Sequence, residues 1–102
     1  MTPAERKEKI AQLEKAAIIL KTVANPLRLG IIHLLEESPK LSVGDLCKFL
    51  KAEQSLISHH LLSMKKKGIL ECKREGRNIY YSLKLKDVTK IIDCLENCEV
   101  KF

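Results

Sequence analysis

The stretch "LSVGDLCKFLKAEQSLISHHLLSMKKKG", residues 41–68, contains two helical patterns separated by a few residues. Ser42 can cap the first helix, and Asp45 three residues later can return a hydrogen bond that completes a capping box. The second helix has apolar residues spaced at i, i+4 and i+7, namely Ile57, Leu61 and Met64. Two helices joined by so short a turn predict a helix-turn-helix over residues 42–67.

The opposite face of the second helix consists of Ser55, Ser58, His59 and Leu62, and is polar apart from the leucine. Its short hydroxyl side chains and single imidazole bury little area, but they allow a helix backbone to approach base edges in the DNA major groove. The candidate base contacts are Gln54, Ser55, Ser58 and His59. Three lysines at the end of the helix are candidate phosphate contacts: Lys65, Lys66 and Lys67. The alternative for these polar residues is a solvated surface without a DNA contact. His60 falls on the apolar side of the helix and is expected to be packed and hydrogen-bonded.

The residues before this region predict two more helices. An apolar pattern at helical spacing indicates a first helix over residues 1–24. The second begins with Asn25 as its cap and Pro26 at its first helical position, and it stops before Pro39.

The residues after this region predict a hairpin and a last helix. Apolar and polar positions alternate on either side of Glu75-Gly76-Arg77, which indicates a two-stranded wing over residues 69–84. A helical pattern returns over residues 86–102. The expected fold is mainly α-helical with a small β-hairpin, in the order helix, helix, helix, helix, strand, strand, helix. That order describes a winged helix-turn-helix in one domain, residues 1–102.

The first and last helices have apolar faces that a chain of this length cannot fully cover. A homodimer that pairs through residues 1–24 and 86–102 would bury them. The expected interface residues are Ile10, Leu13, Ala17, Leu20, Val88, Ile91 and Leu95.

The net charge of +6 is concentrated in the middle of the chain. Residues 40–86 contain eleven Lys/Arg and four Asp/Glu, which gives 11 − 4 = +7, so the rest of the chain sums to −1. Such a one-sided excess favours a polyanion, and double-stranded DNA is the expected partner. Candidate wing contacts to phosphate or the minor groove are Arg74, Arg77, Asn78 and Tyr80. A solvated turn is the alternative for the wing.

Several function classes are not expected. The longest apolar runs are far shorter than the roughly 18 residues of a membrane span, and the charged N-terminus leads into no signal-like segment, so a cytoplasmic protein without a membrane partner is expected. An enzyme is not expected either. The sequence has no phosphate-cradling glycine loop, and His59 and His60 point to different sides of one helix.

The chain resembles the ArsR/SmtB family of winged-helix transcriptional regulators from about Leu20 to Leu83. Four segments carry the resemblance: "LKTVANPLRLGIIHLLEE", "LSVGDLCKFL", "QSLISHHLLSMKKKGIL" and "REGRNIYYSL". The resemblance implies a homodimer that binds imperfect palindromes in promoters as a repressor and is released by an effector. It also implies that the residues matching Gln54, Ser55, Ser58 and His59 face the major groove.

The effector patterns of the family are incomplete here. Metal-sensing members have a Cys-Val-Cys pattern where this chain has Ser42-Val43-Gly44, and the last helix has no histidine. "LSVGDL" resembles the thiol-redox, HlyU-like branch, but His33 stands near the position of its second-helix cysteine. No metal or other cofactor is therefore expected.

Cys94 and Cys98, one turn apart on the last helix, are the remaining effector candidates. Doubled across a dimer axis they could bind Zn²⁺ as four thiolates, or they could be oxidised or converted to persulfides. The alternative is that both are small apolar interface residues, and Cys47 and Cys72 are expected on core faces. The leading hypothesis is thus a dimeric DNA-binding repressor. A protein-interaction module, and a thiol- or metal-handling protein with incidental DNA contact, are the alternatives.

Overall fold

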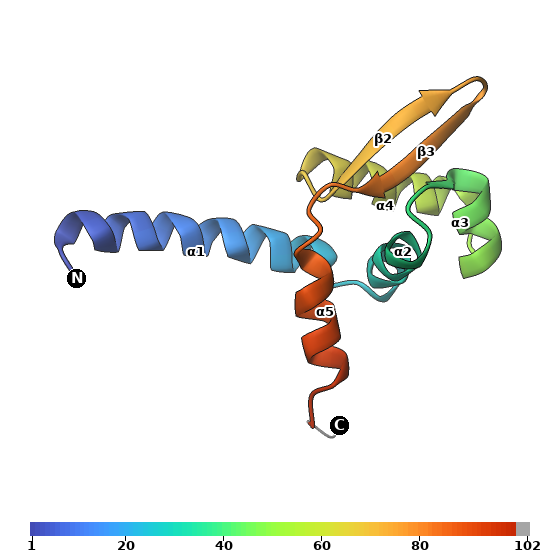
Figure 1. Cartoon of the computed structure of the whole chain (residues 1–102). Coiled ribbons are helices and arrows are strands. Elements are labelled where there is room, and N and C mark those ends of the chain that lie inside the picture. The colour runs from blue at the N-terminus through green and yellow to red at the C-terminus, as the bar shows by residue number, and fades with distance from the viewer. Residues whose placement is uncertain (100–102) are drawn as a thin grey trace.

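The computed structural model describes residues 1–99, which form five helices and a small sheet. Figure 1 shows how these elements are arranged. In chain order the elements are α1 (Pro3–Val23), α2 (Pro26–Glu37), β1 (Leu41–Ser42), α3 (Val43–Leu50), α4 (Gln54–Lys66), β2 (Leu70–Glu75), β3 (Asn78–Leu83) and α5 (Val88–Glu96). The expected mainly α-helical winged helix-turn-helix is confirmed, with one strand more than the sequence predicted.

Side-chain caps fix where the central helices begin. The Asn25 carboxamide oxygen accepts hydrogen bonds from the backbone N–H groups of Leu27 at 2.9 Å and Arg28 at 3.2 Å, which starts α2. Ser42 and Asp45 form the predicted capping box at the start of α3, with distances of 3.1 Å and 3.0 Å. The backbone N–H of Ser42 donates to the Asp45 carboxylate, and this bond lowers the pKa of Asp45.

The predicted two-stranded hairpin is confirmed as β2 and β3, and β1 adds a third strand that the sequence did not predict, in the antiparallel order β1-β3-β2. Leu41 lies opposite Tyr81 and Ser42 opposite Tyr80. The turn of the wing is also one residue shorter than expected. Glu75 pairs with Asn78, which leaves Gly76 and Arg77 as the loop, and Gly76 has the positive φ of 62° that such a tight turn needs.

The core lies between α2, α3, α4 and the sheet. The predicted apolar face of α4 is confirmed, since Ile57, Leu61 and Met64 are completely buried. They pack with the buried residues of the other elements: Val23, Ile31, Ile32, Leu35, Leu41, Leu46, Ile69, Leu70, Val88 and Ile92. Burial of this face turns the polar face of α4 outward, which is the orientation that the sequence predicted.

The two terminal helices are shorter than predicted. α1 ends at Val23. α5 spans Val88–Glu96, whereas a helix over residues 86–102 was expected; residues 100–102 lie outside the described range. A turn in which the Val88 N–H bonds to the Leu85 carbonyl delays the start of α5. α1 buries only Thr22 and Val23, and Figure 1 shows the rest of it projecting from the body.

Between residues 1 and 99, no single helix has both the length and the apolar composition to cross a membrane. α1 and α2 reach that length and apolar composition only when they are taken together, and the pair is bent by 95° at the break between them.

Candidate nucleic-acid interface

The outward face of α4 presents the predicted base-contact residues to solvent. Gln54, Ser55 and His59 are exposed, and Ser58 is half-buried. They lie on the first two turns of the helix, whose backbone N–H groups and dipole make this end electropositive. The structure therefore brings these four polar side chains together on one accessible face, where they could contact an anionic, hydrogen-bonding partner.

A hydrogen-bond network holds α4 against α2 and the end of α1. The Arg28 side chain donates from Nε to His60 Nδ1 at 2.9 Å and from Nη1 to the Thr22 carbonyl oxygen at 2.8 Å. His60 is 8% exposed, which confirms the prediction that it is packed and hydrogen-bonded rather than free to contact a ligand. The network fixes the orientation of α4, and so of the exposed His59 beside His60.

The protonation of His60 opposes folding. Burial is the main cause that lowers the pKa of His60, and the charges of Arg28 and His59 add to it. A protonated His60 could not accept the Arg28 hydrogen bond, because both ring nitrogens would then be donors.

We expect the free energy of unfolding to fall as the pH falls through 6.5, the ordinary histidine pKa, towards the lower pKa of folded His60. In that window the unfolded chain takes up a proton that the folded chain resists. Urea unfolding at pH 7.5 and at pH 5.0 measures the loss. His60→Gln should lose less stability over this interval than the wild type. Equal losses in the two proteins would contradict the assignment to His60.

The three lysines at the end of α4 are all exposed, as expected for phosphate contacts. They are not equivalent. The Cys72 side chain on β2 raises the pKa of Lys65, first as a hydrogen-bond partner and then through the charge of its thiolate form. By helical spacing, Lys66 lies on the outer stripe of α4 with Ser55, Ser58 and His59.

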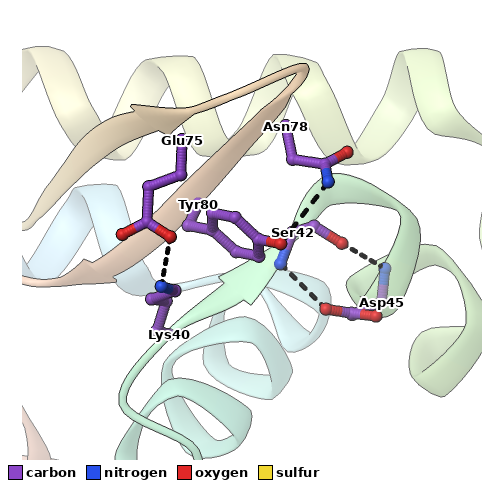
Figure 2. Close-up of polar contacts among 6 residues, drawn as sticks. All are labelled: Lys40, Ser42, Asp45, Glu75, Asn78 and Tyr80. Atoms are coloured by element: carbon purple, nitrogen blue, oxygen red, sulfur yellow. Dashed lines mark hydrogen bonds and ion pairs between the residues drawn. The ribbon is translucent and has the colours of Figure 1, made fainter.

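The wing is fastened to the body near its tip by a set of polar contacts, which Figure 2 shows. The Lys40 ammonium forms an ion pair with Glu75 and lies 4.6 Å from the centre of the Tyr80 ring. The Lys40 hydrogen bond lowers the pKa of Glu75. The Asn78 amide donates to the Tyr80 hydroxyl oxygen at 3.4 Å.

These contacts separate the predicted wing residues into two groups. Arg74, Arg77 and Asn78 are exposed and could reach a phosphate, whereas Tyr80 is half-buried with its ring against Lys40. Sequence reasoning missed Lys40, because its partner Glu75 lies 35 residues further along the chain. The only signal available for Lys40 was its membership of the basic block.

The comparisons with known proteins identify the family. Residues 25–71, from the cap of α2 to the start of β2, match the model of the bacterial regulatory protein, arsR family. The chain is 38% identical over 91 residues to the transcriptional repressor PagR of Bacillus anthracis. The aligned region covers 89% of this chain and 91% of PagR. This chain belongs to the ArsR family. It is therefore a transcriptional regulator of that family and not an enzyme.

Solved structures of other ArsR-type regulators have the same fold. Reduced HlyU from Vibrio cholerae has a TM-score of 0.80 at 30% identity, with 93% of this chain and 99% of HlyU covered. A second neighbour is the solution structure of the homodimeric winged helix-turn-helix domain of Mb0332 from Mycobacterium bovis. It has a TM-score of 0.74 at 28% identity, with 86% of this chain and 81% of that domain covered. The wing and helix-turn-helix of this ArsR-family chain thus follow a shared architecture.

An apolar groove separates α1 from α5 in this ArsR-family protein. It has a volume of about 200 Å³ and is lined by Ala16, Ile19, Leu20, Leu85, Asp87, Val88 and Ile91. Of the predicted interface residues, Val88 is buried in the core, while the other six are accessible: Ile10, Leu13, Ala17, Leu20, Ile91 and Leu95. Both terminal helices therefore present apolar side chains that the chain itself does not cover.

The four cysteines of this ArsR-family protein are free of disulfide bonds and differ in exposure. Cys94 and Cys98 are exposed at the end of α5, and Cys47 and Cys72 are half-buried. Among residues 1–99, no three His, Cys, Asp or Glu side chains are grouped so that they could hold a metal ion. Cys94 and Cys98, the predicted effector candidates, are thus exposed to solvent in the single chain.

Proposed function

We propose that this ArsR-family protein is a homodimeric repressor that binds an imperfect palindrome in promoter DNA. The observation that carries the proposal is the orientation of α4, which buries Ile57, Leu61 and Met64 and turns the exposed Gln54, Ser55 and His59 and the half-buried Ser58 outward. Short polar side chains on an exposed helix fit the major groove, where each base pair presents a distinct set of donors and acceptors. Repression as the direction of control is supported by the similarity to PagR.

The pairing of two copies through α1 and α5 follows from their uncovered apolar side chains. Two copies would close the groove between these helices and cover Leu20 and Ile91, which are 47% and 40% exposed. The homodimeric state of the Mb0332 domain supports this arrangement. A twofold dimer presents two α4 helices to successive major grooves about 34–36 Å apart, which is why we propose a palindromic operator.

The lysines and arginines supply the sequence-independent part of binding. Lys65, Lys66, Arg74 and Arg77 are exposed on the same side as the polar face of α4 or on the wing. Contact with phosphates would release counterions, so that affinity falls with a salt slope of about −0.9 per phosphate contacted. The base contacts of α4 would then add the preference for an operator.

An effector that releases the repressor is part of the proposal. The exposed thiols of Cys94 and Cys98 support oxidation, persulfide formation or metal binding at the end of α5 as the signal. DNA binding by the reduced protein should therefore change after addition of an oxidant, a sulfane-sulfur donor or Zn²⁺. A Cys94→Ser/Cys98→Ser variant should keep the reduced protein's affinity under all of these conditions. Binding by the wild type that is unchanged by all three additions would exclude the thiols as the effector site.

Selection of DNA sequences by the purified reduced protein tests the proposal as a whole. We expect a palindromic consensus and a defined band shift on it. Binding to protein partners with no preferred DNA sequence would favour the alternative, a protein-interaction module.

Lys66→Ala is expected to weaken binding to every DNA sequence, since it removes a phosphate contact and no base contact. If each subunit loses one contact, the salt slope should become shallower by about 1.8, twice the value for a single phosphate. Titrations of operator and of random duplex at several salt concentrations measure both effects. Lys7→Ala, on the projecting end of α1, serves as the control and should leave the slope unchanged. A loss confined to the operator would contradict the role of Lys66.

A further inference from the structure

One apolar side chain interrupts the polar face of α4. Leu62 is 48% exposed and lies at i+3 from His59 and at i+4 from Ser58. It therefore shares their side of the helix, one turn further from the N-terminus. Lys65 and Lys66 follow at i+3 and i+4, so Leu62 stands between the candidate base contacts and the candidate phosphate contacts.

The proposed dimer does not account for this leucine. Five exposed apolar residues of α1 and α5 belong to the proposed subunit interface, namely Ile10, Leu13, Leu20, Ile91 and Leu95, and Ile79 lies on the projecting wing. The large exposed apolar residues of the helix-turn-helix itself are Phe49, Leu56 and Leu62. Leu56 is six residues from Leu62, which places the two side chains about 120° apart around the helix axis and Leu56 outside the polar face. Leu62 is thus the large apolar residue of the surface that faces the groove.

The chemistry of the major groove offers one apolar group, the C5-methyl of thymine. A leucine can neither donate nor accept a hydrogen bond, and against a phosphate it would only remove water from a charge. Against a methyl group it buries apolar area from both sides. We infer that Leu62 contacts a thymine methyl in each half-site and so makes the operator specific for thymine at that position.

This inference rests on the proposed function and adds to it one specificity-determining residue and the base that it selects. The thymine would lie beyond the bases contacted by Ser58 and His59, because Leu62 lies one turn further along the same face of α4. The burial of one methyl group changes affinity about fourfold, and about sixteenfold when both half-sites are changed.

Replacement of thymine by deoxyuridine tests the inference, since it removes the methyl group and keeps the base pair. Each thymine of the selected operator is replaced in both half-sites in turn, and the affinity of the wild type is measured. We expect one position, or two adjacent ones, at which the replacement weakens binding about sixteenfold. Leu62→Ala should bind the thymine and the uracil operators at that position equally well. Circular dichroism checks that the variant is folded.

Leu56→Ala is the matched control, because Leu56 is a similarly exposed leucine, 45% accessible, on another side of the same helix. It should retain the wild-type preference for thymine over uracil. If a defined operator shows no thymine that depends on its methyl group, or if Leu62→Ala keeps the wild-type ratio, the inference is overturned while the proposed function stands. If selection yields no preferred sequence, both are overturned.

Discussion

Ile91→Asp is expected to convert the dimer into monomers and to lower operator affinity by at least about a hundredfold. Ile91 is 40% exposed and lines the groove between α1 and α5 that a second subunit would close. A carboxylate at this position would lose its water on pairing without gaining a partner, which costs several kcal/mol. A monomer would hold one half-site only, so the operator would lose the contacts of the second α4.

Sedimentation at micromolar concentration and a titration of the operator measure the two effects of this substitution. Lys90→Asp is the control, because it places the same carboxylate on the neighbouring residue of α5, whose side chain is 82% exposed. This control should remain a dimer. Because Ile91 is partly exposed in the single chain, the variant should fold, which circular dichroism confirms or refutes. An Ile91→Asp protein that stays dimeric would place the subunit interface elsewhere.

His59→Ala should reduce the preference for the operator over random DNA by about a hundredfold, or about tenfold for each half-site. The imidazole of His59 is exposed on the face of α4 directed away from the core, while the neighbouring His60 is held by Arg28. Loss of a contact to a base edge affects only the sequence that contains that base. Binding to random DNA, which depends on the lysines and arginines, should change by less than about threefold.

Competition titrations with operator and random duplex of equal length separate these outcomes. Ser58→Ala, one residue earlier on the same face, should act in the same direction. Lys66→Ala provides the opposite pattern, with similar losses on both duplexes. Equal losses on both duplexes for His59→Ala would mean that His59 contacts phosphate and not a base.

The helix-turn-helix could be predicted from the sequence because its signals are local. The capping box needs only Ser42 and Asp45, and the two faces of α4 follow from spacings of three and four residues. The third strand could not be predicted in this way. β1 contains two residues, too few to show alternation, and it exists because Leu41 and Ser42 pair with Tyr81 and Tyr80 about forty positions later.

The side-chain contacts that position the site were also beyond sequence reasoning. The burial of His60 follows from its place on the helix, but its partner Arg28 is 32 residues away on α2. Likewise Lys40 acts on the wing through Glu75 and Tyr80, which the fold alone brings to it. The lengths of α1 and α5 were overestimated because apolar spacing continues past the residues at which the backbone turns.

The projection of α1 has a consequence for how the protein responds to its own abundance. This helix of 21 residues buries only Thr22 and Val23 against its own body, so in the proposed homodimer most of its support comes from the second subunit. Where the dimer is weak, the supply of assembled protein grows with the square of the number of chains in the cell. Promoter occupancy would then rise steeply over a narrow range of expression, which gives the regulator a threshold even before any signal reaches it.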